Sequence, residues 1–219
     1  MTIDLYFNRY SGPVRAVWMT VRQLKLDVNF KPVDLAVSEQ LKPEFLALNP
    51  FHTVPTLVDD GFALWESRAI MQYLCNRYAP DSTLYPKDPK QRALVDRSLN
   101  FDLTLLNQIE EVVFTPIFSG APPSADKVTA LNNSFKNLDQ VLIKQNKYLV
   151  GDQLTLADLS LLAYWVYLEK SNTDVSAYPN FQRWVAGLKA ELPYYNEVNG
   201  ISQAEWDQEM ARYLASIAK

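Results

Sequence analysis

The segment from Ile3 to Leu26, IDLYFNRYSGPVRAVWMTVRQLKL, contains the pattern that decides the fold. Residues Ile3 to Phe7 alternate apolar and polar side chains, which is the period of a half-buried strand. Asn8 to Gly12 interrupt that pattern with turn-forming residues, and Pro13 suits the first turn of a helix, where its missing N–H would have no helical partner. Apolar residues then recur at spacings of three and four to about Leu26, where we expect the helix to end. We therefore predict a strand, a loop and a helix.

The residues that follow extend this unit into a small sheet. We expect a strand at Val28–Leu35, a short helix at Lys42–Leu48, a hairpin of Thr56–Val58 and Phe62–Leu64 around Asp59-Asp60-Gly61, and a helix at Glu66–Tyr78. The order βαβ-ββα predicts an α/β domain over residues 1–79.

The rest of the chain has almost no strand pattern. Residues 80–89 contain three prolines and several polar side chains, which is typical of a linker. Helical periodicity then predicts an all-α domain over residues 90–219, with helices at Arg92–Phe118, Ala125–Lys144, Thr155–Lys170, Asn180–Leu192 and Gln203–Ile217. Thr155 and Asp158 fit a capping box, which marks a helix start.

Composition excludes several classes of function. The 219 residues have a net charge of −4 and no basic stripe, which argues against nucleic acid as a partner. No apolar run approaches the roughly 20 residues of a membrane span, and the N-terminus does not resemble a signal peptide, so we expect a cytoplasmic protein. With one cysteine, Cys75, and one histidine, His52, the chain cannot form an intramolecular disulfide or a Cys/His zinc site. We expect no metal, and we expect Cys75 to be a small buried apolar residue.

The loop Ser11-Gly12-Pro13-Val14 lies where a thioredoxin-like fold places its Cys-x-x-Cys pair. Without sulfur, disulfide exchange is not expected. A hydroxyl beside a helix N-terminus still suits a thiolate, because the helix dipole stabilises negative charge there. The alternative is that Ser11 is only a turn or N-cap residue.

Two further segments carry candidate binding groups. Pro55 precedes a predicted strand, where a cis bond after Val54 would turn the Val54 backbone outward to pair with an extended peptide; the alternative is an ordinary turn. In Trp65-Glu66-Ser67-Arg68, the amides of a helix start and the Ser67 hydroxyl suit a carboxylate, while Glu66 suits an ammonium group. The alternative there is a capped helix with solvated charges.

Together these segments resemble the glutathione site of the cytosolic glutathione transferases, and their sequence is most similar to the arthropod delta and epsilon classes. The similar stretches are LYFNRYSGPVRAV (5–17), LKPEFLALNPFHTVPTLVDDGFALWESRAIMQYL (41–74), TLYPKDP (83–89) and GDQLTLADLSL (151–161). WESRAI (65–70) is nearest to the delta class. The resemblance implies an enzyme that conjugates the thiolate of glutathione, its co-substrate, to electrophilic hydrophobic small molecules.

The same resemblance implies residue roles. Ser11 would donate a hydrogen bond to the glutathione sulfur. The remaining glutathione-binding residues would be His52, Val54, Pro55, Glu66, Ser67 and Arg68. The electrophile pocket would be lined by Pro13, Asn107, Glu110, Phe114, Phe118, Trp206 and Tyr213. A homodimer is also implied, with Phe51 and Phe101 as contacts.

The chain departs from the family pattern at two places. Asn8-Arg9-Tyr10 stand where delta-like chains commonly have Leu-Pro-Gly, so Tyr6 remains a rival thiol activator. Asn107 and Glu110 stand where related chains often have aromatic residues, which points to a more polar pocket. The competing function is a non-catalytic carrier of glutathione or hydrophobic ligands. A purely structural module would have no need of Ser11 together with Pro55, Glu66 and Ser67.

Overall fold

The computed structural model describes residues 2–217 of the chain. It divides into two compact units. One comprises Met1–Ala79 with Asn196–Lys219, and the other comprises Pro80–Tyr195. The two units are groups of residues that pack together, and α11 packs with the first of them. The domain limits expected at residues 79 and 90 therefore stay predictions.

The first unit is built on a four-stranded mixed sheet, and the predicted α/β thioredoxin-like fold is confirmed. The strand order is β2-β1-β3-β4, with β1 parallel to β2 and antiparallel to β3, and β3 antiparallel to β4. The elements are β1 (Ile3–Phe7), α1 (Gly12–Gln23), β2 (Asn29–Pro32), the 3-10 turns η1 (Leu35–Val37) and η2 (Glu39–Leu41), α2 (Pro43–Leu46), β3 (Thr56–Asp59), β4 (Phe62–Trp65) and α3 (Ser67–Tyr78). The same unit includes α10 (Tyr195–Asn199) from its second residue onward, and α11 (Gln203–Ile217).

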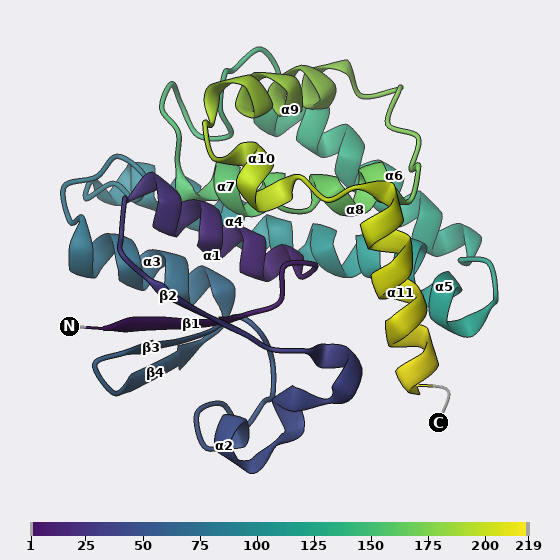
Figure 1. Cartoon of the computed structure of the whole chain (residues 1–219). Helices are drawn as coiled ribbons and strands as arrows, with labels where there is room; N and C mark the ends of the chain where they lie inside the picture. Colours follow the sequence, from purple (N-terminus) through teal and green to yellow (C-terminus); the bar gives the residue numbers. More distant parts are fainter. Residues whose placement is uncertain (1, 218–219) are drawn as a thin grey trace. The chain divides into compact units, whose positions relative to one another are not determined.

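Helices cover both faces of this sheet, with α1 and α3 on one face and α2 on the other (Figure 1). Alternation along β1 decides which side chain meets which helix. Phe7 packs edge-on against Trp18 of α1, and Tyr6 packs edge-on against Phe45 of α2. Leu5 is fully buried on the α1 side, so the core of the unit lies there.

Two elements of the first unit end about three residues earlier than predicted, and the other ends differ by less. The strand expected at Val28–Leu35 is only Asn29–Pro32: the Val33 N–H makes the last bond to β1, donating to the Phe7 carbonyl at 2.8 Å, and Asp34 then caps the 3-10 turn η1, which takes the chain out of the sheet. Helix α1 ends at Gln23, and Lys25 takes a left-handed conformation with φ 55°. The hairpin turn has the expected form, since Asp60 and Gly61 both have positive φ (49° and 87°), as a type I′ turn requires.

The second unit is all-helical, as predicted. Its elements are α4 (Pro89–Ile109), a π-helical segment η3 (Glu110–Phe114), α5 (Thr115–Ser119), α6 (Ala125–Asn137), a second π-helical segment η4 (Leu138–Ile143), α7 (Leu156–Leu162), α8 (Trp165–Lys170) and α9 (Pro179–Glu191). The capping box at Thr155 is present, and both reciprocal hydrogen bonds with Asp158 are made.

Three properties follow from the described residues. Cys75 is a buried thiol, as expected. None of the helices between residues 2 and 217 is both long and apolar enough to cross a membrane. Within the same range, no three His, Cys, Asp or Glu side chains come together in a group fit for a metal ion.

Candidate functional site

Sheet register brings the predicted site segments to one end of the sheet. Tyr6, near the end of β1, lies opposite Thr56 at the start of β3, and Thr56 lies opposite Trp65 at the end of β4. The loop to Ser11, the segment before β3 and the start of α3 therefore share this end. Because β2 runs parallel to β1, with Phe7 beside Pro32, the turn after β2 lies there too.

Ser11 is the N-cap of α1. Its Oγ accepts a hydrogen bond from the Val14 N–H at 3.4 Å. A hydroxyl that accepts through a lone pair still has its proton to donate, so the N-cap role and donation to a thiolate are compatible. No acidic residue occupies the first turn of α1, so nothing there offsets the positive end of the helix dipole.

Asn8 organises the loop that leads to Ser11. Its carbonyl accepts from the Ser11 N–H at 3.1 Å, its Oδ1 accepts from the Tyr10 N–H at 3.1 Å, and its Nδ2 donates to the Val33 carbonyl at 3.1 Å. One side chain thus ties the loop to itself and to the residue after β2.

Arg15 holds the same loop from the α1 side. Its side chain is fully buried, and Nη1 donates to the carbonyls of Arg9 and Tyr10 at 3.1 and 2.8 Å. Sequence reasoning gave Arg15 no role. The available signal was a charged residue among the buried positions Val14 and Val17 of an apolar helix face.

The Val54–Pro55 bond is cis, as predicted. Asn49, a residue that the sequence analysis did not single out, holds the preceding turn. Its side chain is fully buried and donates to the Thr53 carbonyl and to the Thr56 hydroxyl at 3.1 and 3.0 Å. Its Oδ1 accepts from the Phe51 N–H at 2.9 Å. The approach to Val54 is therefore rigidly hydrogen-bonded.

Two of the predicted binding residues have strained backbones. Glu66 has φ 71° and His52 has φ 48°, conformations that non-glycine residues seldom adopt. Such strain persists where surrounding structure enforces it, and it clusters at binding sites. Glu66 is exposed, while Ser67 is 3% exposed and its Oγ accepts from Arg68 Nη1 at 3.1 Å.

Tyr6 has a different environment from Ser11. Its ring centroid lies 5.8 Å from that of Phe45, on the α2 face of the sheet. Tyr6 and Phe45 line a hollow of about 180 Å³ together with Pro32, Val33, Glu39, Lys42, Glu44 and Leu48. Neither Ser11 nor any of the predicted glutathione-binding residues lines this hollow.

The electrophile-pocket candidates are distributed over both units. Pro13, Trp206 and Tyr213 belong to the first unit, and the other four belong to the second. Asn107 and Glu110 are exposed; Phe114 stacks on Phe118 with ring centroids 6.3 Å apart. Glu110 and Phe114 bound the π-helical segment η3, a local irregularity frequent at functional sites. The assembly of these seven residues into one pocket stays a prediction.

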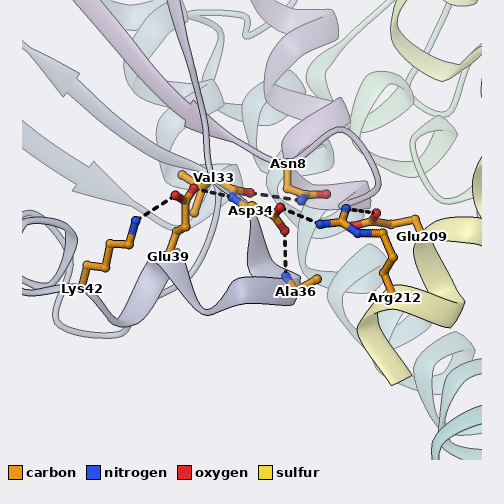
Figure 2. A network of polar contacts seen from close by, with 8 residues as sticks. All are labelled: Asn8, Val33, Asp34, Ala36, Glu39, Lys42, Glu209 and Arg212. Carbon is orange, nitrogen blue, oxygen red and sulfur yellow. Dashed lines mark hydrogen bonds and ion pairs between the residues drawn. The ribbon is translucent and has the colours of Figure 1, made fainter. Parts of the chain in front are cut away.

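A polar network joins α11 to the turn after β2 (Figure 2). Arg212 donates to Asp34 Oδ2 and to Glu209 Oε2, each at 2.7 Å. The hydrogen bond from Arg212 lowers the pKa of the Asp34 carboxyl. The Asp34 N–H in turn donates to Glu39 at 2.9 Å, which lowers the pKa of the Glu39 carboxyl, and Lys42 pairs with Glu39. All these residues belong to the first unit.

Comparisons with known proteins agree with this geometry. A family model described as the N-terminal domain of glutathione S-transferase matches residues 5–82, and one described as its C-terminal domain matches residues 105–191. A delta-class glutathione transferase of Nilaparvata lugens is 38% identical, with 99% of this chain and 98% of that chain covered and a TM-score of 0.86.

Two further solved structures are similar over nearly their whole length. An epsilon-class glutathione S-transferase of the housefly, Musca domestica, is 35% identical, with 98% of each chain covered and a TM-score of 0.84. Glutathione transferase E6 of Drosophila melanogaster is 37% identical, with 98% of this chain and 97% of that chain covered and a TM-score of 0.83. The mixed sheet, the all-helical unit and these matches define a transferase that uses glutathione. The chain belongs to the glutathione S-transferase family, and it is a glutathione transferase enzyme.

Proposed function

We propose that this enzyme conjugates the thiolate of glutathione to electrophilic hydrophobic small molecules, and that the Ser11 hydroxyl stabilises the thiolate. The observation that carries the proposal is the meeting of three segments at one end of the sheet. They supply a hydroxyl at a helix N-terminus, a backbone turned by a cis proline, and the buried start of α3.

Each segment suits one part of the tripeptide. The backbone of Val54 pairs with the cysteinyl unit in the manner of an added strand. The Ser67 hydroxyl and the first amides of α3 hold the γ-glutamyl carboxylate, while Glu66 takes the ammonium group. His52 and Arg68 help to position the rest of the glutathione tripeptide. The sulfur then lies at the Ser11 hydroxyl.

The energy required is within reach of this arrangement. A free thiol of pKa about 8.5 is only roughly 3% ionised at pH 7. Lowering that pKa by about two units requires about 2.7 kcal/mol of preference for the thiolate. One hydrogen bond to a charged group supplies about 1.5–3 kcal/mol, and the helix dipole adds about 0.3–1 kcal/mol. The proposed chemistry therefore requires neither a metal nor a general base.

The environment of Tyr6 supports Ser11 over the rival activator. Tyr6 packs on Phe45 and faces the α2 side of the sheet, whereas Ser11 is held by Asn8 at the end of the sheet shared by the binding segments. The hydroxyl at the helix N-terminus also has the dipole in its favour.

A homodimer is part of the same proposal. Phe51 has 62% of its surface exposed and packs against Trp65 with ring centroids 5.8 Å apart, which is an apolar contact surface suited to a second copy. Light scattering of the wild type and of Phe51→Ser tests it: a dimer weakened by the substitution supports the assignment, and a monomeric wild type contradicts it.

The proposed function is tested by a conjugation assay on a panel that includes an aryl halide and an α,β-unsaturated carbonyl, run beside direct glutathione binding. We expect glutathione binding together with turnover of at least one electrophile. Binding with no turnover of any of them would identify the carrier instead.

A further inference from the structure

Helix α11 is connected to the loop of Ser11 by two separate routes within the first unit. We propose that Arg212 is a positioning residue for the glutathione site, because it clamps α11 to the turn after β2 and thereby fixes the loop that aims the Ser11 hydroxyl. This inference rests on the proposed role of Ser11.

The first route runs through side chains and carbonyls. Arg212 joins Glu209, which is only 8% exposed on α11, to Asp34 (Figure 2). Asp34 directly follows Val33, whose carbonyl accepts from Asn8 Nδ2. Asn8 then accepts from the backbone N–H groups of Tyr10 and Ser11. Three hydrogen-bonded contacts and the peptide bond between Val33 and Asp34 thus lead from α11 to the Ser11 backbone.

The second route is direct. The Tyr10 ring packs against Trp206, which is 5% exposed, with ring centroids 6.4 Å apart. Arg9 lies 3.9 Å from the Glu205 carboxylate, and its Nη2 donates to the Gly200 carbonyl at 3.4 Å. The two residues just before Ser11 are therefore held by the start of α11 and the segment before it.

Both routes depend on the position of α11. Arg212 holds the later turns of this helix to the turn after β2 through its contact with Asp34. The Arg212 side chain is 45% exposed, so the clamp operates near the surface, where ion pairs are modest and salt weakens them. The expected effect is therefore a graded loosening of the loop. Loss of the fold is not expected.

The test compares Arg212→Met, Asp34→Asn and the double variant with the wild type. Asparagine retains an oxygen that accepts from the Ala36 N–H, as Asp34 does, so the local turn is kept. The control is Arg22→Met, which breaks a similarly exposed ion pair between α1 and Glu197 outside both routes.

The readouts are the amide hydrogen exchange of residues 10–11 and 203–217 and the thiol pKa of bound glutathione. We expect exchange at residues 10 and 11 to be about two- to fivefold faster in Arg212→Met, which is the scale of one exposed ion pair. The pKa of the bound thiol should rise by about 0.3–0.7, because a two- to fivefold change in the ionisation constant corresponds to that difference in pKa. Asp34→Asn should match it, the double variant should add nothing further, and about 1 M salt should reproduce the effect in the wild type.

An ion pair that only stabilises the fold would lower the unfolding midpoint and leave the bound thiol pKa unchanged. That result, or an equal pKa shift in Arg22→Met, would overturn the inference. If Ser11→Ala leaves the thiol pKa unchanged, the proposed function fails on its own. In that case the exchange measurement still decides whether Arg212 holds the loop.

Discussion

Replacing Asp158 by alanine should strongly destabilise the helical unit. The side chain is fully buried at the third position of α7, and its carboxylate accepts four hydrogen bonds. One oxygen accepts from the Leu149 N–H and the Trp184 Nε1–H at 2.8 and 3.1 Å. The other accepts from the Thr155 N–H and hydroxyl, both at 3.0 Å. Burial raises the pKa of this carboxyl, and the four donors oppose that rise.

The magnitude follows from these donors. A buried donor left without a partner costs about 1–3 kcal/mol, and water entering the space recovers part of the total. We therefore expect Asp158→Ala to lower the free energy of unfolding by about 3–5 kcal/mol, out of a typical total of about 5–15 kcal/mol. Asp158→Asn keeps one accepting oxygen but turns an NH₂ group towards two donors, so it should cost about half as much.

Thermal and urea unfolding measure this loss. For a chain of this size, about 3–5 kcal/mol corresponds to roughly 6–20 °C in Tm. The control is Asp152→Asn, an exposed carboxylate in the preceding loop that removes the same charge. A Tm for Asp158→Ala within about 2 °C of the control, less than about 1 kcal/mol, would refute the assignment of these hydrogen bonds to stability.

Two other predictions concern the site and the sheet. Glu66→Ala and Ser67→Ala should raise the KM for glutathione about tenfold with kcat nearly unchanged, because Glu66 and Ser67 bind a part of the substrate remote from sulfur. Steady-state kinetics measure both constants, and equal losses in kcat for the two variants would contradict these roles. Burial and a hydrogen bond to Asp59 raise the pKa of Tyr78 to about 12, above the ordinary value of 10.0. The protonated Tyr78 phenol therefore contributes fully to the free energy of unfolding below pH 10, and this contribution is lost as the pH rises towards 12. Unfolding curves should therefore show a smaller alkaline loss in Tyr78→Phe, and an unchanged pH profile would disprove the linkage.

Periodicity and turn chemistry were sufficient to predict most of the fold. The alternation in β1, the Asp60-Gly61 turn and the capping box at Thr155 each depend on neighbouring residues, and each is present in the structure. The cis bond before Pro55 was also predicted, because proline is the residue that tolerates it.

What the sequence did not predict depends on contacts between distant segments or on small changes in helical pitch. The π-helical segments at Glu110–Phe114 and Leu138–Ile143 continue the apolar pattern of the preceding helices, so periodicity gave no sign of them. Arg212 and Asp34 are 178 residues apart, and each alone has the pattern of a solvated charge. Asn8-Arg9-Tyr10, the departure from the family pattern, make contacts that only the folded chain brings together.

The central claim is that Ser11 donates a hydrogen bond to the glutathione thiolate. Ultraviolet titration of bound glutathione measures the thiol pKa directly in the wild type, Ser11→Ala and Tyr6→Phe. We expect Ser11→Ala to raise that pKa by about one to two units, equivalent to about 1.4–2.7 kcal/mol, with little change in glutathione affinity, and Tyr6→Phe to do much less. An unchanged pKa in Ser11→Ala together with a raised pKa in Tyr6→Phe would contradict the account and assign the activation to the tyrosine.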